Sequence, residues 1–395
     1  MTDLYWDPFD TDIDTDPYGT WRRMRDDAPL YRNDRYDFWA LSRFADVEAA
    51  HRDARTFCSG HGTVLELMQA EPFTNGQMIF LDPPEHTRLR TLVSRAFTPR
   101  RVDALEDRIR ELSADFLDRL AGRDSFDYVQ DFAVYLPSMV ISSLLGVPLG
   151  DQETLRKLID QVFHIEPGVG MINDVSFGAQ IEINTYIRAQ LEECIAHPRD
   201  DMLTDLSVAE ITDDDGVERR LSLGEGADFA NLLISAGTET VARLLGWASV
   251  ILADHPDQRA ELAADSSLLA NAVEELLRYE APSPVQGRWT TREVELHGEV
   301  LPAASKVLLL TGSAGRDDRA YPDADRFDIH RAFDLHMSFG YGIHFCLGAA
   351  LARMEGRIAL EETLKRFPEW DVDHEHVVRL HTSTVRGFAQ VPIRV

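Results

Sequence analysis

The segment at residues 338–353, SFGYGIHFCLGAALAR, constrains the fold more than any other part of the chain. It predicts a glycine-containing loop followed by a helix that begins at Cys346. Gly340 and Gly342 let the backbone approach a flat ligand closely. The amino end of a helix lowers a thiol pKa and offers free NH groups to a bound sulfur. Phe339 can cover that sulfur and limit the access of water, so we expect a cysteine thiolate that binds a metal.

Other interpretations of Cys346 remain open at this point. A lone cysteine is most often a small buried hydrophobic residue, and we leave Cys58 and Cys194 with that interpretation. Around Cys346 the neighbouring Phe, Gly and His, and Gly348 just inside the expected helix, favour a ligand, because a core cysteine needs none of them. A Cys–His nucleophile with His344 as its base is weaker, since no orienting partner is evident. A zinc site would need further Cys or His residues nearby.

An acid and a hydroxyl lie inside the apolar run 231–242, NLLISAGTETVA. Gly237 costs a helix about 1 kcal/mol relative to Ala, and Glu239 and Thr240 add polar groups that need compensation. In a structural interpretation, Thr240 bonds back to the carbonyl of Ala236 and Glu239 forms a buried ion pair. In a functional interpretation, both side chains serve a site beside this helix. The residues alone leave both open.

The remaining pattern predicts a mainly α protein with small β-sheets, folded as a single domain over residues 1–395. Helical periodicity is strong at 102–120, 155–161, 177–195, 228–254, 268–279 and 346–367. Short β-like runs occur at 38–41, 294–296, 306–310 and the carboxyl terminus. The stretches 60–77 and 196–220 are expected to be long surface connections, of the kind that often gate a site.

The charge balance argues against a general nucleic-acid binder. The chain has 68 acidic and 40 basic residues, a net charge of −28, whereas phosphate binding needs clustered Lys and Arg. Three cysteines are too few for a disulfide framework, and the acidic, aromatic amino terminus lacks the features of a signal peptide. No run of about 18 apolar residues is present. We expect a soluble, cytoplasmic protein with no membrane span and a small-molecule partner.

Phe339, Gly342, His344, Cys346 and Gly348 together resemble the signature Phe-x-x-Gly-x-His/Arg-x-Cys-x-Gly of the cytochrome P-450 superfamily. The resemblance implies the cytochrome P-450 fold, with haem b between a long distal helix and a proximal helix that carries the cysteine. It implies that Cys346 is the axial thiolate ligand of the haem iron, a ligand that pushes electron density toward the metal. The implied activity is that of a haem-thiolate monooxygenase. The motifs follow in order from about residue 16 to residue 395.

The resemblance also assigns roles to other residues. The run 231–242 is similar to the distal motif Ala/Gly-Gly-x-Asp/Glu-Thr, which implies that Glu239 and Thr240 handle water and protons on the oxygen side of the haem. Haem carries two propionates, and buried carboxylates need charged or hydrogen-bonded partners. The residues implied to bind the haem are His86, Arg90, Ala236, Arg288, Phe339, Gly340, His344 and Cys346.

Glu275 and Arg278, which are spaced i, i+3 on one helix face, resemble the Glu-x-x-Arg pair of the superfamily. The arginine that completes this triad in the family maps to Arg326, although Ala324 stands where a proline is usual. We expect the triad to brace the proximal side and assign it no direct chemistry.

The family's substrate-contacting segments are chiefly apolar in this sequence, which implies a lipophilic small-molecule substrate. Terpenoids, steroids, fatty acids and polyketides all remain open, and a small aromatic acid is not excluded. The implied contact residues are Val64, Leu65, Leu67, Met68, Phe73, Phe163, Ile165, Met171, Ile172, Leu233, Ala236, Val285 and Val385.

The resemblance implies that the co-substrate is dioxygen and that electrons come from a separate ferredoxin and its reductase, because no flavin or nicotinamide domain follows in the sequence. The acid-free stretch 87–102 is either a docking face for an acidic partner or propionate binding by one arginine plus ordinary solvated charge. Its arginines are Arg88, Arg90, Arg95, Arg100 and Arg101, and Arg353 and Arg357 extend the set.

Two other functions stay open. A peroxygenase would take hydrogen peroxide in place of dioxygen and electrons, and the retained Glu239 and Thr240 argue against it. A haem-thiolate gas sensor or ligand-binding protein would need neither this acid–alcohol pair nor an apolar pocket.

Overall fold

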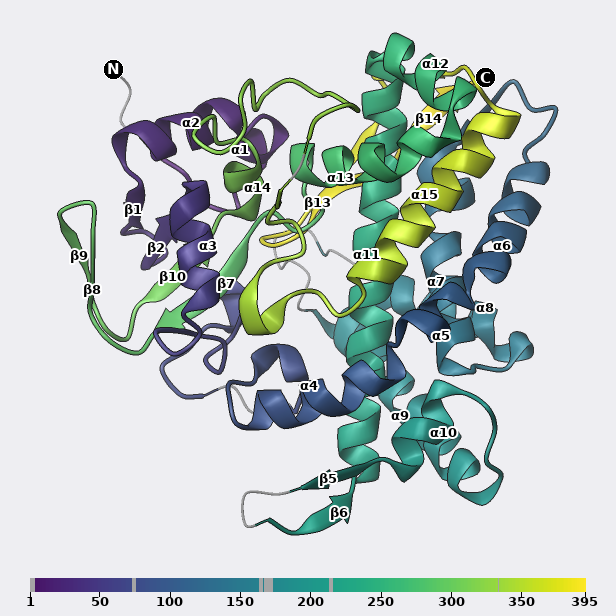
Figure 1. Ribbon diagram of the computed structural model, residues 1–395, viewed down its shortest axis with the longest axis horizontal. Helices are drawn as coiled ribbons and strands as arrows, with labels where there is room; N and C mark the ends of the chain where they lie inside the picture. The colour runs from purple at the N-terminus through teal and green to yellow at the C-terminus, as the bar shows by residue number, and fades with distance from the viewer. Residues whose placement is uncertain (1–3, 73–75, 163–165, 167–172, 213–215, 333) are drawn as a thin grey trace.

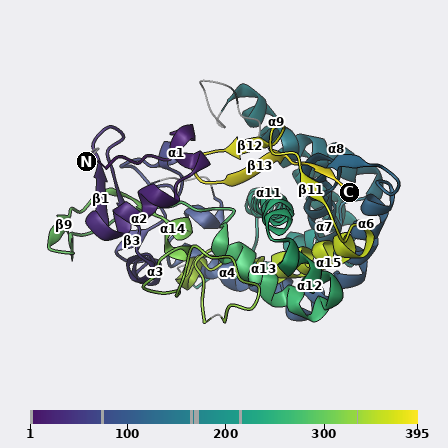
Figure 2. The same cartoon turned by 90° about the horizontal axis from the view of Figure 1, so that it is seen from above.

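The computed structural model describes residues 4–72, 76–162, 166, 173–212, 216–332 and 334–395. It is mainly helical with small sheets, which confirms the expected fold class. Helix α11 (Leu223–Asp254) runs through the centre of the molecule, and Figure 2 looks along its axis. Ser222 begins it with a capping box: its hydroxyl accepts from the Glu225 NH, and the Glu225 carboxylate accepts from the Ser222 NH. Most of α11 is buried because other elements cover several of its faces.

The helices that pack against α11 include α7 (Tyr135–Leu145), α9 (Asp174–Ala196), α13 (Leu269–Tyr279) and α15 (Ala349–Arg366). The other α-helices are α1 (Thr11–Thr15), α2 (Tyr18–Asp27), α3 (Phe44–Arg52), α4 (Glu85–Ala96), α5 (Pro99–Asp103), α6 (Glu106–Asp118), α8 (Leu149–Val162), α10 (Met202–Val208), α12 (Pro256–Ala264) and α14 (Thr311–Gly315). Short 3-10 turns are η1 (Leu65–Leu67), η2 (Met78–Phe80), η4 (Ser266–Leu268) and η5 (Gly342–His344), and η3 (Val129–Ala133) is a π-helical turn.

The largest sheet has five strands in the order β1-β2-β10-β7-β3, and it lies with α1 to α3 on the left of Figure 1. Strands β2 and β10 are parallel and the other neighbours are antiparallel. Its strands are β1 (Leu30–Asn33), β2 (Phe38–Leu41), β3 (Phe57–Cys58), β7 (Gln286–Thr290) and β10 (Lys306–Leu309). A second sheet joins β4 (Ser125–Asp127), β11 (Asp371–Val372) and β14 (Pro392–Arg394), and the hairpins are β5 (Glu210–Thr212) with β6 (Glu218–Arg220), β8 (Val294–Leu296) with β9 (Glu299–Leu301), and β12 (Val378–His381) with β13 (Arg386–Gln390).

Each periodic segment of the sequence contains helix, although α8, α9 and α11 begin three to six residues before the expected positions. The expected helix at 102–120 is divided into α5 and α6. The expected helix at 346–367 begins only at Ala349, and Gly348 is its N-cap and not its first turn, so that prediction was wrong at its start. The strands expected at 38–41 and 294–296 are β2 and β8.

The two expected surface connections are partly structured. Residues 196–220 contain α10 and the β5–β6 hairpin, so the prediction of a plain connection was wrong there. Asp201 caps α10 by accepting from the Thr204 NH at 2.8 Å, and Met202 and Leu203 are buried. In the stretch 60–77, Leu65 and Met68 are buried in a core cluster. Among the described residues, no helix has both the length and the apolar character needed to cross a membrane.

Candidate active site

The loop before α15 folds Cys346 back onto its own start. The Cys346 NH donates to the Phe339 carbonyl at 2.9 Å, while Gly340 and Gly342 have φ angles of 64° and 70°. A Cβ atom on Gly342 would lie 2.4 Å from the carbonyl oxygen of His51 on α3. Only glycine therefore satisfies both the backbone angle and the close approach of α3 at that position.

The charge environment of Cys346 differs from the sequence prediction. Burial raises the pKa of the Cys346 thiol, and the Gly348 NH, Arg90 and Arg353 oppose that shift without reversing it. The backbone NH of Gly348, the N-cap of α15, lowers the pKa as expected, but burial of the sulfur outweighs it. A bound metal ion would supply the missing stabilisation, since metal binding deprotonates a coordinating thiol outright.

Phe339 is held as a rigid cover by its neighbours. The ring is buried, and the Arg353 guanidinium lies 4.5 Å from its centroid. Arg353 is itself fixed by two bonds to the Glu274 carboxylate at 2.5 and 2.8 Å. The Phe345 ring, one residue before Cys346, meets Phe339 edge-on at 6.2 Å. This arrangement can shield a sulfur from solvent.

Four residues predicted to bind one ligand come together from three parts of the chain. His86 and Arg90 lie one turn apart on α4, His344 ends η5, and Arg288 lies on β7. The rings of His86 and His344 are 4.3 Å apart. Positive charge from Arg288 and from Arg90 both act on His344, so the four side chains share one electrostatic environment.

Each of the two arginines of this group donates to one backbone carbonyl. Arg90 donates to the Phe345 carbonyl at 2.7 Å, and Arg288 donates to the Gly287 carbonyl at 2.7 Å. Neither forms an ion pair with a carboxylate of the described residues. A guanidinium has five N–H donors, so each retains capacity for an anion.

Ring nitrogens of both histidines in this group are buried and lack partners among the described residues. Both ring nitrogens of His86 and Nε2 of His344 have no hydrogen-bond partner within the described part of the chain. Burial lowers the pKa of His86 to about 4, with Arg90 adding to the shift, and lowers the pKa of His344 to about 2, with Arg288 adding to it. Burial also lowers the pKa of Arg288 to about 10. Buried polar groups are normally satisfied, so this cluster fits a ligand with carboxylates, as the haem propionates are.

The structure adds His51, which the sequence reasoning missed. His51 on α3 is buried, and neither ring nitrogen has a partner among the described residues. Burial and then Arg288 lower its pKa to about 3, and its Cε1 would lie 3.7 Å from a Cβ on Gly340. A sequence signal existed, because His51 follows Val47 and Ala50 on the apolar stripe of its helix.

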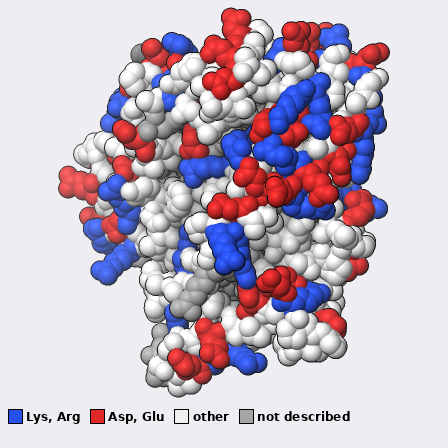
Figure 3. All heavy atoms as spheres, turned by 45° about the vertical axis from the view of Figure 1, so that its right-hand side comes forward, with Lys and Arg blue, Asp and Glu red and all other residues white. Residues whose placement is uncertain are grey.

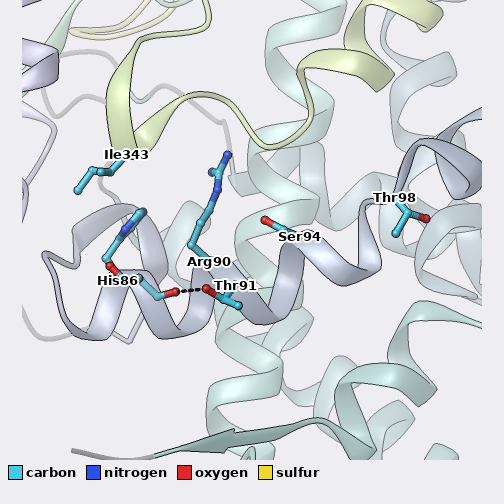
Figure 4. Close-up of a pocket in the computed structure, with 7 residues that line it drawn as sticks. His86, Arg90, Thr91, Ser94, Thr98 and Ile343 are labelled. Atoms are coloured by element: carbon cyan, nitrogen blue, oxygen red, sulfur yellow. Dashed lines mark hydrogen bonds between the residues drawn. The ribbon is translucent and has the colours of Figure 1, made fainter.

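An open cleft of about 590 Å³ connects this cluster with the surface along α4. Figure 4 shows His86 and Arg90 pointing from α4 toward the loop that carries Ile343. The hydroxyls of Thr87, Thr91, Ser94 and Thr98 line the same cleft.

On α11 the acid and the hydroxyl of the distal motif both have local partners. The Thr240 hydroxyl donates to the Ala236 carbonyl at 3.1 Å, and Ala236 is exposed although most of its helix is buried. The Glu239 carboxylate accepts from Arg243 at 2.8 Å. These are the contacts of the structural interpretation, and the proton-handling roles of Glu239 and Thr240 stay predictions.

The buried triad has a different third member from the one expected. Glu275 and Arg278 are fully buried and joined by two bonds at 2.7 and 2.8 Å. The arginine that completes the set is Arg331, whose Nε donates to Glu275 at 3.2 Å. The assignment of Arg326 was wrong: its side chain is exposed and pairs with Asp328, while only its backbone carbonyl contacts Arg278.

The expected substrate contacts are only partly described. Leu65, Met68 and Val285 belong to one buried cluster, while Leu233 belongs to the main core. Phe73, Phe163, Ile165, Met171 and Ile172 lie outside the described residues.

The family model of cytochrome P-450 matches residues 34–394. The chain belongs to the cytochrome P-450 family, whose members are haem enzymes with a cysteine thiolate on the iron.

Comparison with individual proteins gives the same result. The chain is 42% identical to cytochrome P-450 123 of Mycobacterium tuberculosis, over 100% of this chain and 97% of that one. It is 37% identical to the cytochrome P-450 monooxygenase PikC of Streptomyces venezuelae, over 97% of this chain and 92% of that one. The solved structure of cytochrome P-450 CYP109Q5 from Chondromyces apiculatus superposes with a TM-score of 0.89 at 35% identity, covering 98% of this chain and 97% of that one.

Proposed function

We propose that this cytochrome P-450 inserts one oxygen atom from dioxygen into a lipophilic small molecule, with Cys346 as the thiolate ligand of its haem. The observation that carries the assignment is the cluster around the Cys346 loop, where buried ring nitrogens of His51, His86 and His344 and the guanidinium groups of Arg90 and Arg288 all lack a carboxylate partner among the described residues. The same cluster supports a single haem domain over residues 1–395. The three unpaired cysteines support a reducing, cytoplasmic setting.

Different residues around the Cys346 loop would contact different parts of the haem. His51, His86, Arg90, Arg288 and His344 would hold the propionates, because charge-assisted hydrogen bonds to carboxylates are about twice as strong as neutral ones. Phe339 would shield the thiolate, Gly340 and Gly342 would allow the loop to lie close to the macrocycle, and Ala236 would leave room beside α11.

The bound haem supplies the activation of dioxygen, and α11 supplies the protons. The Thr240 hydroxyl donates to the Ala236 carbonyl, which fixes its position. The lone pairs of the hydroxyl oxygen stay available to accept a hydrogen bond from a proton donor. Glu239, one residue earlier, would relay protons from solvent to this hydroxyl. A proton donor positioned in this way contributes typically 10²–10⁴-fold to a rate.

The substrate class is proposed from the family rather than from a described pocket. One relative is a vitamin D(3) 25-hydroxylase of Pseudonocardia autotrophica, at 38% identity, and CYP109E1 from Bacillus megaterium was solved with corticosterone and with testosterone. Steroids are therefore the first compounds to test among the lipophilic classes. A binding screen reading the haem absorbance shift would compare steroids with terpenoids, fatty acids and polyketides.

The proposed electron donor is a ferredoxin, and the proposed docking arginines differ in whether an acidic residue of the chain already pairs with them. Arg101 pairs with Asp205, and Arg357 pairs with Glu106 at 3.0 Å. Figure 3 shows basic and acidic side chains alternating over the face that carries α6 and α15. Arg100 is exposed and forms no ion pair with a described residue. The side chain of Arg95 lies outside the described part.

Product formation under defined conditions distinguishes a monooxygenase from a peroxygenase and from a haem-thiolate sensor. With labelled dioxygen, NADH and a surrogate ferredoxin and reductase, a monooxygenase places one labelled atom in the product. A peroxygenase would form product from hydrogen peroxide without reductase, and a sensor would form no product under either condition. Either of these two results would overturn the proposal.

A further inference from the structure

Arg243 joins the proposed proton-relay acid to the carboxyl-terminal hairpin. Its Nε donates to Glu239 Oε1 at 2.8 Å, and its Nη1 donates to the carbonyl of Phe388 on β13. The two side chains of the ion pair are 5% and 10% exposed. A guanidinium has donors in fixed, divergent directions, so one arginine can make both contacts where a lysine cannot.

Strand β13 holds the arginine in place by direct backbone packing. A Cβ on Gly387 would lie 2.7 Å from Cδ of Arg243, so the strand lies against the aliphatic stem and tolerates only glycine without movement. One turn further along α11, Trp247 donates to the Arg386 carbonyl at 3.2 Å. Arg243 cannot leave Glu239 without disturbing this joint between α11 and β13.

We propose that Arg243 is a positioning residue for proton delivery, and this inference rests on the proposed role of Glu239. By engaging Oε1, it leaves Oε2, which has no hydrogen-bond partner among the described residues, as the oxygen that accepts and releases protons. It also ties the direction of Glu239 to the position of β13. The strand follows the turn that carries Val385, one of the residues expected to contact substrate.

One further charged group interacts with Glu239. Asp160 on α8 is half-exposed; partial burial raises its pKa, Arg156 lowers it, and Glu239 raises it further. Arg156 and Asp160 are themselves joined at 2.6 Å. Asp160 therefore presents a second carboxyl, in contact with solvent, on the side of α8.

The test compares Arg243→Gln, Glu239→Gln and the double variant, each loaded with haem. Hydrogen peroxide formed per NADH consumed is measured with a surrogate ferredoxin and reductase and with testosterone as the probe. Loss of a residue that orients a functional group typically costs about 10–100-fold, so Arg243→Gln should raise peroxide relative to water and product by about 10-fold. Arg243→Lys, which keeps the charge beside Glu239, should recover part of the coupling.

The double variant decides whether Arg243 acts through Glu239. If it does, adding Arg243→Gln to Glu239→Gln changes the peroxide fraction no further, because residues that act as a unit are not additive. An additive increase would overturn the inference. If Arg243→Gln does not fold, the double variant, which leaves no buried charge unpaired, is compared with Glu239→Gln alone and decides in the same way.

Trp247→Phe is the matched control. It removes the neighbouring bond to β13 and leaves the ion pair intact, so it should lower the urea concentration of half-unfolding without raising peroxide. If Trp247→Phe raises the peroxide fraction as much as Arg243→Gln does, proton delivery depends on the packing of α11 against β13 and not on Arg243 itself. If Glu239→Gln itself leaves peroxide unchanged, the proposed relay fails, whereas a failure confined to Arg243→Gln and Arg243→Lys refutes only this inference.

Discussion

Replacing Arg288 by methionine should raise the stability of the haem-free protein and weaken its binding of haem. Arg288 is 5% exposed, and burial lowers its pKa to about 10. A base with a lowered pKa holds its proton less firmly in the folded state than in the unfolded state, so its charge destabilises the haem-free fold. At 1.36 kcal/mol per pKa unit this amounts to roughly 3 kcal/mol. Methionine removes that charge and keeps a flexible apolar chain of similar length.

With haem bound the sign reverses. The guanidinium then offsets a buried propionate, and removing one partner of a buried charge pair typically costs about 3–5 kcal/mol. Because 1.4 kcal/mol is a tenfold change in affinity, Arg288→Met should weaken haem binding by roughly two to three and a half orders of magnitude.

Two measurements test this pair of effects. Urea unfolding followed by circular dichroism gives the free energy of unfolding of the haem-free protein, and transfer of haem to apomyoglobin gives its affinity. Arg100→Met, at an exposed arginine, is the control and should change neither. A variant of Arg288 that is less stable without haem and retains haem like the unmodified protein would refute the reasoning.

Four further outcomes follow from the same structure. Thr240→Ala should keep haem and electron uptake but shift NADH consumption from product to hydrogen peroxide, and full coupling would leave its hydroxyl a purely structural group. Arg331→Ala should lower the free energy of unfolding by about 1.5–3 kcal/mol, as expected for a bond to a buried charge, whereas Arg326→Ala should stay within about 0.5 kcal/mol; the reverse order would restore Arg326 to the triad. The pKa of His86 is lowered from 6.5 to about 4, and those of His51 and His344 are lowered further, so the haem-free protein should lose stability as pH falls through this window. His86→Gln should remove part of that loss in urea titrations at each pH; an unchanged slope would show that His86 contributes nothing to it. Arg100→Glu should slow reduction by an acidic ferredoxin, and the unmodified protein should also slow as salt rises; rates that respond to neither change would leave Arg100 outside the docking surface.

The sequence predicted the site best where the backbone itself is constrained. The spacing of Gly340, Gly342 and Cys346 leaves few conformations, and the structure confirms a tight loop at these residues. The start of the following helix was less predictable, because a few backbone hydrogen bonds decide whether it begins at Cys346 or at Ala349. The direction of the thiol pKa was not predictable either, because it depends on how deeply the sulfur is buried.

Long-range contacts explain the remaining errors. Arg326 and Arg331 lie on one irregular segment, and only the fold determines which guanidinium reaches Glu275. His51 is far in sequence from Arg288 and Gly340, and the packing of α3 against the loop brings it to them. Local patterns carry no direct information on such pairs.

The measurement that tests the central claim most directly is the absorbance spectrum of the reduced, carbon-monoxide-bound protein. Cys346 should give the red-shifted Soret band of thiolate-ligated haem, since a thiolate pushes electron density toward the iron. Cys346→Ser should lose this band, while Cys58→Ser and Cys194→Ser, at the two buried cysteines, should retain it. A band that persists in Cys346→Ser and disappears in either control would contradict the account.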